Sequence, residues 1–115
     1  MLVAGLLACQ AVLAFAHAIV LESTPGAGAR LDRAPAAVVL RFNSRIEKRL
    51  SRVTLEQGRA QGPRQPLAVD PTSGGADRLV IPLPPQGAGS YVVRYRVLST
   101  DGHITEGVLR FTVGP

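Results

Sequence analysis

The sequence predicts an all-β protein, a Greek-key β-sandwich of about seven strands that is preceded by a signal peptide. Three observations support this prediction. Apolar and polar residues alternate over short segments, which is typical of strands with one buried face. The chain of 115 residues contains 12 Gly and 9 Pro, and these gather between the alternating segments, where turns are expected. Residues 1–16 are apolar almost throughout.

Residues 1–16 have the features of a secretory signal peptide. They read MLVAGLLACQAVLAFA and end in Ala14-Phe15-Ala16, the small-x-small pattern that a signal peptidase recognises. The apolar run is too short to span a bilayer comfortably as a helix. No Lys or Arg precedes it, so either the true start lies upstream or the signal is weak. We expect cleavage after Ala16, which leaves residues 17–115 as the mature domain.

Two alternatives to cleavage stay open. An uncleaved segment would tether the domain to a membrane. In addition, Leu6-Leu7-Ala8-Cys9 resembles a lipoprotein box in which Cys9 is acylated, although the apolar stretch before it is short for that role. Both alternatives leave His17 inside the chain.

Seven segments carry the strand pattern, and turn residues separate them. The stretch from Gly28 to Pro35 is expected to be a loop, and 44–50 is expected to be irregular or a single helical turn. The expected strands are 18–22, 37–42, 51–56, 66–69 (an edge strand), 78–83, 90–99 and 105–113. The side chains expected to point inward are Val38, Leu40, Phe42, Val53, Leu55, Leu79, Ile81, Leu83, Tyr91, Val93, Tyr95, Val97, Leu109, Phe111 and Val113, whereas Val92, Arg94 and Arg96 are expected to point outward.

Composition excludes several classes of function. The formal net charge is +5, but the positive residues are scattered, with no basic run and no interleaved aromatic residues on which bases would stack. Nucleic-acid binding is therefore not expected. The single Cys is at position 9 and the single Met at position 1, so the domain has no disulfide framework and no thiolate or thioether metal site.

The domain contains two histidines, and both occupy unusual positions. Cleavage after Ala16 would make His17 the first residue, so that its α-amine and a ring nitrogen could bind one metal ion together. Both groups lose their protons to a metal far more readily than a Lys amine does. His103 lies two residues after Asp101 in a loop between two strong strands, and the intervening Gly102 supplies the backbone freedom that such a loop needs.

These residues together offer three nitrogen donors and one oxygen donor. Cu(II) prefers tetragonal nitrogen and oxygen coordination, and it heads the affinity order among divalent first-row metals. The sequence therefore favours a site for Cu(II) at His17, Asp101 and His103. A plainer interpretation stays open, because Asp-Gly is a common hairpin turn signal and a histidine after it can be a solvated turn residue. Glu22 and Glu106 are candidates for orienting a ligand ring.

Long stretches of the domain resemble the CopC family of periplasmic copper-binding proteins. The similarity covers nearly the whole domain, and the stretch from Tyr91 to His103 is its longest and most specific part. The matching residues are His17-Ala18 with Leu21, Ser23 and Pro25-Gly26-Ala27-Gly28, then Val39-Leu40-Arg41-Phe42, then Tyr91-Val92-Val93-Arg94-Tyr95-Arg96-Val97-Leu98-Ser99-Thr100-Asp101-Gly102-His103, and finally Gly107 with Phe111-Thr112-Val113.

This resemblance implies a cupredoxin-like or immunoglobulin-like β-barrel or sandwich. It implies that one Cu(II) ion is bound by the N-terminal His and by the Asp and His of a Ser-x-Asp-x-His loop, which correspond to His17, Asp101 and His103. It also implies a periplasmic copper carrier or buffer without catalytic activity, acting in resistance or delivering copper to a CopD-type importer in the inner membrane. We expect such a protein to be a monomer.

Three features depart from the family's pattern. No Met follows position 1, so a Met-rich Cu(I) site is not expected. Ser44 occupies a position that is often acidic in the family, although Glu47 is close to it in sequence. Tyr95 occupies a position where Trp is common. None of these positions belongs to the proposed ligand set.

Two other functions are compatible with the sequence. An N-terminal His with a second His also resembles the histidine brace of copper oxygenases that act on polysaccharides. Those enzymes need an open coordination position and usually a flat aromatic face, whereas this chain has no Trp and offers Asp101 as a further ligand. The other alternative, if the signal peptide is retained, is a metal-free immunoglobulin-like module that binds a protein.

Overall fold

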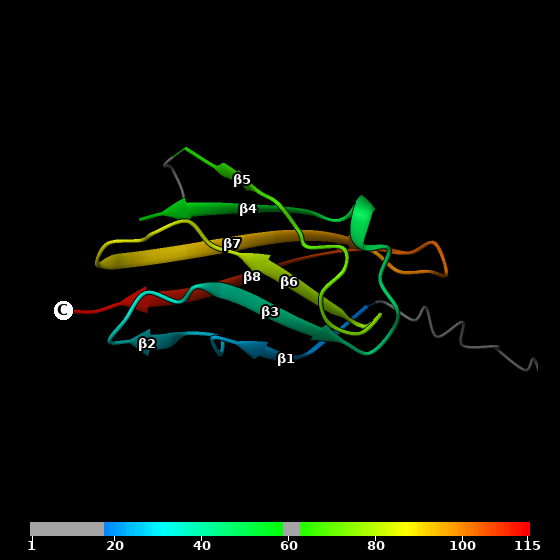
Figure 1. The fold of residues 1–115 in the computed structure, drawn as a ribbon, viewed down its shortest axis with the longest axis horizontal. Coiled ribbons are helices and arrows are strands. Elements are labelled where there is room, and N and C mark those ends of the chain that lie inside the picture. The colour runs from blue at the N-terminus through cyan, green and yellow to red at the C-terminus, as the bar shows by residue number, and fades with distance from the viewer. Residues whose placement is uncertain (1–17, 59–62) are drawn as a thin grey trace, which may run out of the picture.

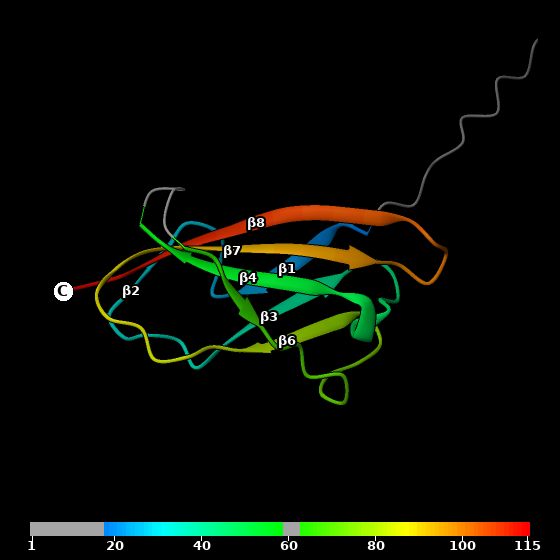
Figure 2. The same ribbon diagram turned by 90° about the horizontal axis from the view of Figure 1, so that it is seen from above.

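Two β-sheets form a sandwich in the computed structural model, which describes residues 18–58 and 63–115 (Figure 1). One sheet has three strands in the order β1-β3-β6, and the other has five in the order β2-β8-β7-β4-β5. Figure 2 shows β4, β7 and β8 in one layer and β3 and β6 in the other. The strands are β1 Val20–Thr24, β2 Ala29–Leu31, β3 Ala37–Phe42, β4 Arg52–Gln57, β5 Gln65–Leu67, β6 Arg78–Pro82, β7 Gly89–Leu98 and β8 Ile104–Val113. The predicted all-β sandwich is confirmed.

The only helical element of the described residues is a short 3-10 turn, Lys48–Leu50, within the segment that was expected to be irregular or one turn. No helix in 18–58 or 63–115 has the length and apolar character needed to cross a membrane. The predicted signal peptide at 1–16 lies outside the described residues. So does His17, and with it the expectation that its ring faces that of His103.

The core lies between the two sheets and follows from the alternation of the strands. In β3, Val38, Leu40 and Phe42 are buried while the residues between them are less so. On the facing sheet, Tyr91 of β7 stacks on Phe111 of β8 with ring centroids 5.5 Å apart. The buried apolar residues are Ala18, Val38, Leu40, Phe42, Ile46, Val53, Leu55, Leu79, Ile81, Tyr91, Val92, Val93, Val97, Leu109, Phe111 and Val113.

The strand β2 was not predicted, because Gly28 to Pro35 was interpreted as a loop. Ala29–Leu31 pairs in parallel with residues 111–113 of β8, and the Gly28 amide donates to the Arg110 carbonyl at 2.7 Å. Three residues are too few to show an alternating pattern. Ala29–Leu31 forms a strand because the backbone of β8, which is distant in sequence, supplies its hydrogen-bond partners.

Two further expectations are corrected. Val92 points away from the inner face but is nevertheless buried, because it sits in a central strand between Glu56 of β4 and Arg110 of β8 in register. The predicted edge strand at 66–69 is shifted and spans Gln65–Leu67, where it pairs with β4. Tyr95 and Leu83 are partly buried and pack against the core from its border.

The contrast between a buried and an exposed leucine tests this core. Leu40 is 1% exposed and Leu50 is 63% exposed. We expect Leu40→Ala to lower the free energy of unfolding by about 2–5 kcal/mol, because it removes buried methyl groups and leaves a cavity. The matched variant Leu50→Ala should change it by less than about 0.5 kcal/mol. Urea unfolding followed by circular dichroism measures both, and equal effects would contradict the assigned core.

Candidate metal centre

The loop of residues 99–103 joins β7 to β8 and is held closed by its own backbone. The Ser99 amide donates to the His103 carbonyl at 2.9 Å, and the Gly102 amide donates to the Ser99 carbonyl at 2.9 Å. Gly102 has a φ of 91°, a conformation that side-chain-bearing residues rarely adopt. This glycine lets the chain reverse between Asp101 and His103.

Ser99 organises the two chemically active residues of this loop. Its side chain is almost fully buried, and its hydroxyl hydrogen-bonds the Asp101 carboxylate and lies 3.1 Å from the His103 carbonyl. The His103 amide donates to Asp101 Oδ1 at 3.2 Å. The Ser99 hydroxyl, followed by the His103 amide, lowers the pKa of Asp101 below its ordinary value. Asp101 is therefore an ionised carboxylate over the whole neutral range.

Asp101 and His103 stand at the spacing of two ligands on one ion. Asp101 Oδ1 and His103 Nδ1 are 3.1 Å apart, and both side chains are partly exposed to solvent, at 44% and 37%. Two donors that each lie roughly 2 Å from a metal, at a right angle to one another, are about 3 Å apart. The donor types are also those that suit a divalent transition metal. The two groups contact each other directly here, so an ion bound by both would replace this contact.

The first described residues of the domain are anchored at the same end of the sandwich as this loop (Figures 1 and 2). Ala18 is buried in the core. The Ile19 amide donates to Asn43 Oδ1 at 2.8 Å, and the Asn43 amide donates back to the Ile19 carbonyl at 3.0 Å. Two residues further on, the Arg45 carbonyl accepts a bond from the Thr100 amide at 3.1 Å. The segment 43–45 thus connects the start of the domain to the loop.

The described residues supply two of the three predicted ligands. The structure brings Asp101 and His103 together, while His17 lies outside the described residues. Within 18–58 and 63–115 no group of three or more His, Cys, Asp or Glu side chains is placed to hold a metal ion.

The acidic residues considered for orienting a ligand have other partners or none nearby. Glu22 pairs with Arg41 at 3.1 Å, and Glu106 lies 3.5 Å from Arg96. The side chain of Glu47 makes no ion pair with the described residues, although its amide donates to the Leu98 carbonyl. The residue that does position Asp101 is Ser99.

Sequence reasoning did not assign roles to Ser99 and Asn43. Ser99 belongs to the Ser-x-Asp-x-His pattern, so a signal was present, but its function depends on the closed loop that brings its hydroxyl to the carboxylate. Asn43 carries no comparable signal. Its side-chain oxygen accepts a hydrogen bond from the backbone amide of Ile19, which is 24 residues away in sequence and has no strand partner in the sheet.

The fold and this loop define a small β-sandwich domain with a candidate metal-binding loop at one end. A family model described as the CopC domain matches residues 20–114. The chain therefore belongs to the CopC family, as the resemblance in its sequence indicated.

Two proteins named copper resistance protein C are similar to this chain over most of its length. The one from Pseudomonas syringae pv. tomato is 34% identical over 106 residues, covering 88% of this chain and 83% of the relative. The one from Xanthomonas campestris pv. juglandis is 30% identical over 105 residues, covering 87% and 82%. The names of these relatives connect the family with copper.

Solved structures show the same fold. CopC from Methylosinus trichosporium OB3b is 32% identical, with a TM-score of 0.76, and the match covers 86% of this chain and 95% of that one. PcoC, a methionine-rich copper resistance protein from Escherichia coli, is 31% identical with a TM-score of 0.69, covering 85% and 99%.

Removing the Ser99 hydroxyl tests how the loop is organised. We expect Ser99→Ala to raise the pKa of Asp101 toward its ordinary value, because the hydroxyl is the main group that favours the ionised carboxylate. Loss of the buried hydrogen bonds should also reduce stability by about 1 kcal/mol. Carboxylate NMR titration measures the pKa, with Thr100→Ala, an exposed neighbour, as the control. An unchanged Asp101 pKa in Ser99→Ala would contradict this role.

Proposed function

We propose that this chain is a periplasmic Cu(II)-binding protein that carries or buffers copper, with one ion bound by His17, Asp101 and His103. The observation that carries the proposal is the distance of 3.1 Å between Asp101 Oδ1 and His103 Nδ1, in a loop beside the anchored start of the domain. Membership of the CopC family and the names of the relatives support copper as the metal.

Secretion would complete the ligand set. Cleavage after Ala16 would expose the α-amine of His17, which together with the His17 ring gives two nitrogen donors on one residue. Ala18 is buried and Ile19 is bonded to Asn43, so the described part of the chain begins at the same end of the sandwich as the 99–103 loop (Figure 1). His103 would supply the third nitrogen and Asp101 the oxygen, a set that matches the tetragonal preference of Cu(II).

The chemistry of the chain favours Cu(II) over Cu(I). Soft thioether ligands select Cu(I), and PcoC is described as methionine-rich. The only Met of this chain is residue 1 and the only Cys is residue 9, both within the proposed signal peptide. A second, Met-rich site for Cu(I) is therefore not part of the proposal.

The same ligand set argues for binding without catalysis. Asp101 would occupy a coordination position that a copper oxygenase keeps open for its substrate. We propose that the protein acts as a monomer in copper homeostasis or resistance, and that an inner-membrane copper transporter of the CopD type is the recipient when copper is delivered.

Single replacements of the proposed ligands test the site. Even residues that only orient a ligand typically cost 10–100-fold in metal affinity, so we expect His103→Ala, Asp101→Asn and His17→Ala each to weaken Cu(II) binding by at least about tenfold. A competition titration against a chelator of known affinity measures the constants. Glu22→Gln, which neutralises a carboxylate already paired with Arg41, is the matched control and should bind as the parent does.

The N-terminal amine gives a second, independent test. One additional residue ahead of His17 keeps every side chain but moves the amine, and it should lower the affinity as strongly as His17→Ala. Binding should also weaken in acid, because protons compete for the amine and both rings. Intact mass must first establish that His17 is residue one of the secreted protein. Parental affinity in a correctly processed His17→Ala protein would refute the proposal.

A further inference from the structure

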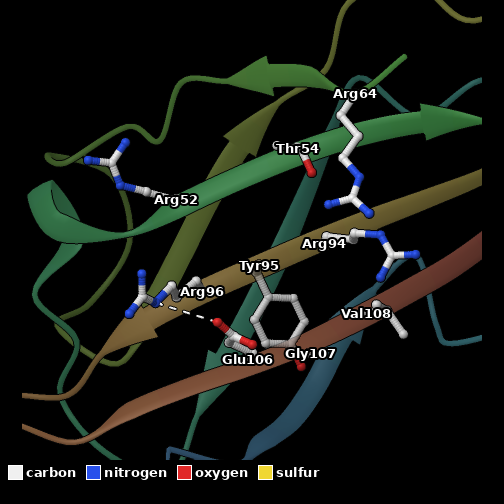
Figure 3. Close-up of a pocket in the computed structure, with 9 residues that line it drawn as sticks. All are labelled: Arg52, Thr54, Arg64, Arg94, Tyr95, Arg96, Glu106, Gly107 and Val108. Atoms are coloured by element: carbon white, nitrogen blue, oxygen red, sulfur yellow. Dashed lines mark ion pairs between the residues drawn. The ribbon is translucent and has the colours of Figure 1, made fainter. Parts of the chain in front are cut away.

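The outer face of the five-stranded sheet carries a cluster of arginines around an open cavity of about 460 Å³ (Figure 3). Its side chains come from β4, from β7 and β8, and from the segment just before β5. The residues that matter here are Arg52, Arg64, Arg94, Arg96, Glu106 and Val108. The metal-binding proposal makes no use of this face, which we call the arginine face.

One row of the arginine face places like charges side by side. Arg52 of β4 is directly opposite Arg96 of β7, which is in turn opposite Glu106 of β8. Glu106 lies 3.5 Å from Arg96, whereas Arg52 makes no ion pair with any described residue. Like charges directly opposite each other on neighbouring strands destabilise a sheet. No ion pair among the described residues compensates Arg52, so its guanidinium is available to a negatively charged ligand.

The other two arginines are held by a buried carboxylate. Glu56 is 1% exposed, and its Oε1 atom lies 2.9 Å from Arg94 Nε and 2.5 Å from Arg64 Nε. Burial by itself raises the pKa of Glu56, but the hydrogen bonds and positive charges of the two arginines outweigh burial and lower it. Glu56 is therefore ionised and keeps both guanidinium groups in place at the cavity.

The charge balance leaves the arginine face positive. Four guanidinium groups meet two carboxylates, those of Glu56 and Glu106, so two positive charges are uncompensated. Figure 3 shows the arginines as two pairs, Arg64 with Arg94 and Arg52 with Arg96, with Thr54 between the pairs. A small anion would meet one pair only. An extended ligand with several negative groups would meet both.

An apolar patch continues the arginine face toward the 99–103 loop. A smaller cavity of about 190 Å³ is lined by Arg52 and Arg96 together with Leu50 and Ile104. Leu50 is 63% exposed and Ile104 is 50% exposed, and Ile104 directly follows His103. Large apolar side chains exposed beside a charged cavity are typical of an interaction site for a protein.

We propose that the arginine face binds an acidic segment of a partner protein, with Asp or Glu carboxylates on the two arginine pairs and an apolar side chain against Leu50 and Ile104. A nucleic acid would use exposed aromatic rings for stacking, but the ring of Tyr95 packs edge-on against Phe42 with centroids 6.0 Å apart and lies over Gly107. A partner bound here would lie next to the 99–103 loop. Binding needs no copper, so it is separable from the function proposed above.

The test uses metal-free secreted protein in the presence of a chelator. The probe is a fluorescein-labelled oligoglutamate peptide with a leucine at one end, and fluorescence anisotropy gives its dissociation constant at low and at physiological salt. The double variant Arg52→Gln/Arg96→Gln should weaken binding by about tenfold, because it removes the unbalanced pair. Binding should also weaken with salt, as contacts between exposed charges do.

The matched control is Arg30→Gln/Arg33→Gln, which changes the net charge by the same amount at β2 and the segment after it. It should weaken binding by less than about twofold. An equal loss in the two double variants would mean that only net charge matters and would overturn the proposal, as would the absence of saturable binding at low salt. Tighter binding of an oligothymidylate or of anionic vesicles, with the same dependence on Arg52 and Arg96, would show that the class of partner is wrong.

Discussion

The antiparallel pairing of β7 with β8 is the interaction on which the rest of the molecule depends. Register runs without interruption from Gly89 opposite Val113 to Leu98 opposite Ile104. At one end this ladder closes through the 99–103 loop, and along its length it supplies the centre of the five-stranded sheet. A slip of one residue would move every side chain of a strand to the opposite face. The register therefore decides which side chains of β7 and β8 enter the core, which lie on the outer face, and which residues form the connecting loop.

The two faces of β7 serve different purposes. Its inward residues Val93 and Val97 are fully buried against the other sheet. Its outward residues Arg94 and Arg96 project from the same rigid backbone, and Glu56 and Glu106 on the neighbouring strands approach them. Because strands alternate, apolar packing inside fixes the position of charged groups outside. Three of the four arginines of the arginine face, Arg52, Arg94 and Arg96, thus take their positions from strands whose other side packs in the core.

The candidate metal centre depends on contacts that hold two distant parts of the chain at one end of the sandwich. Asn43 binds Ile19, the residue before β1, and the Arg45 carbonyl accepts a bond from the Thr100 amide. The segment after β3 therefore connects the first described residues of the domain to the 99–103 loop. Ser99 then sets the Asp101 carboxylate within the loop. Asp101 and His103 thus lie on a loop whose backbone is held by hydrogen bonds, which reduces the entropy that binding an ion would cost.

The sequence by itself determined the strands other than β2 and most inward side chains, because alternation is a local property. Its motifs also indicated the family. Only the tertiary structure decided that Ala29–Leu31 is a strand, that Val92 is buried, and that Glu56 meets Arg94 from 38 residues away. The proximity of Asp101 to His103 was suggested by their spacing, but the Ser99 hydroxyl that holds the carboxylate was not. The strand at 29–31, the burial of Val92 and the Glu56 contact arise from pairing between remote segments, and local periodicity carries no information about which remote segments will pair. The Ser99 contact spans only two residues but depends on how the loop closes.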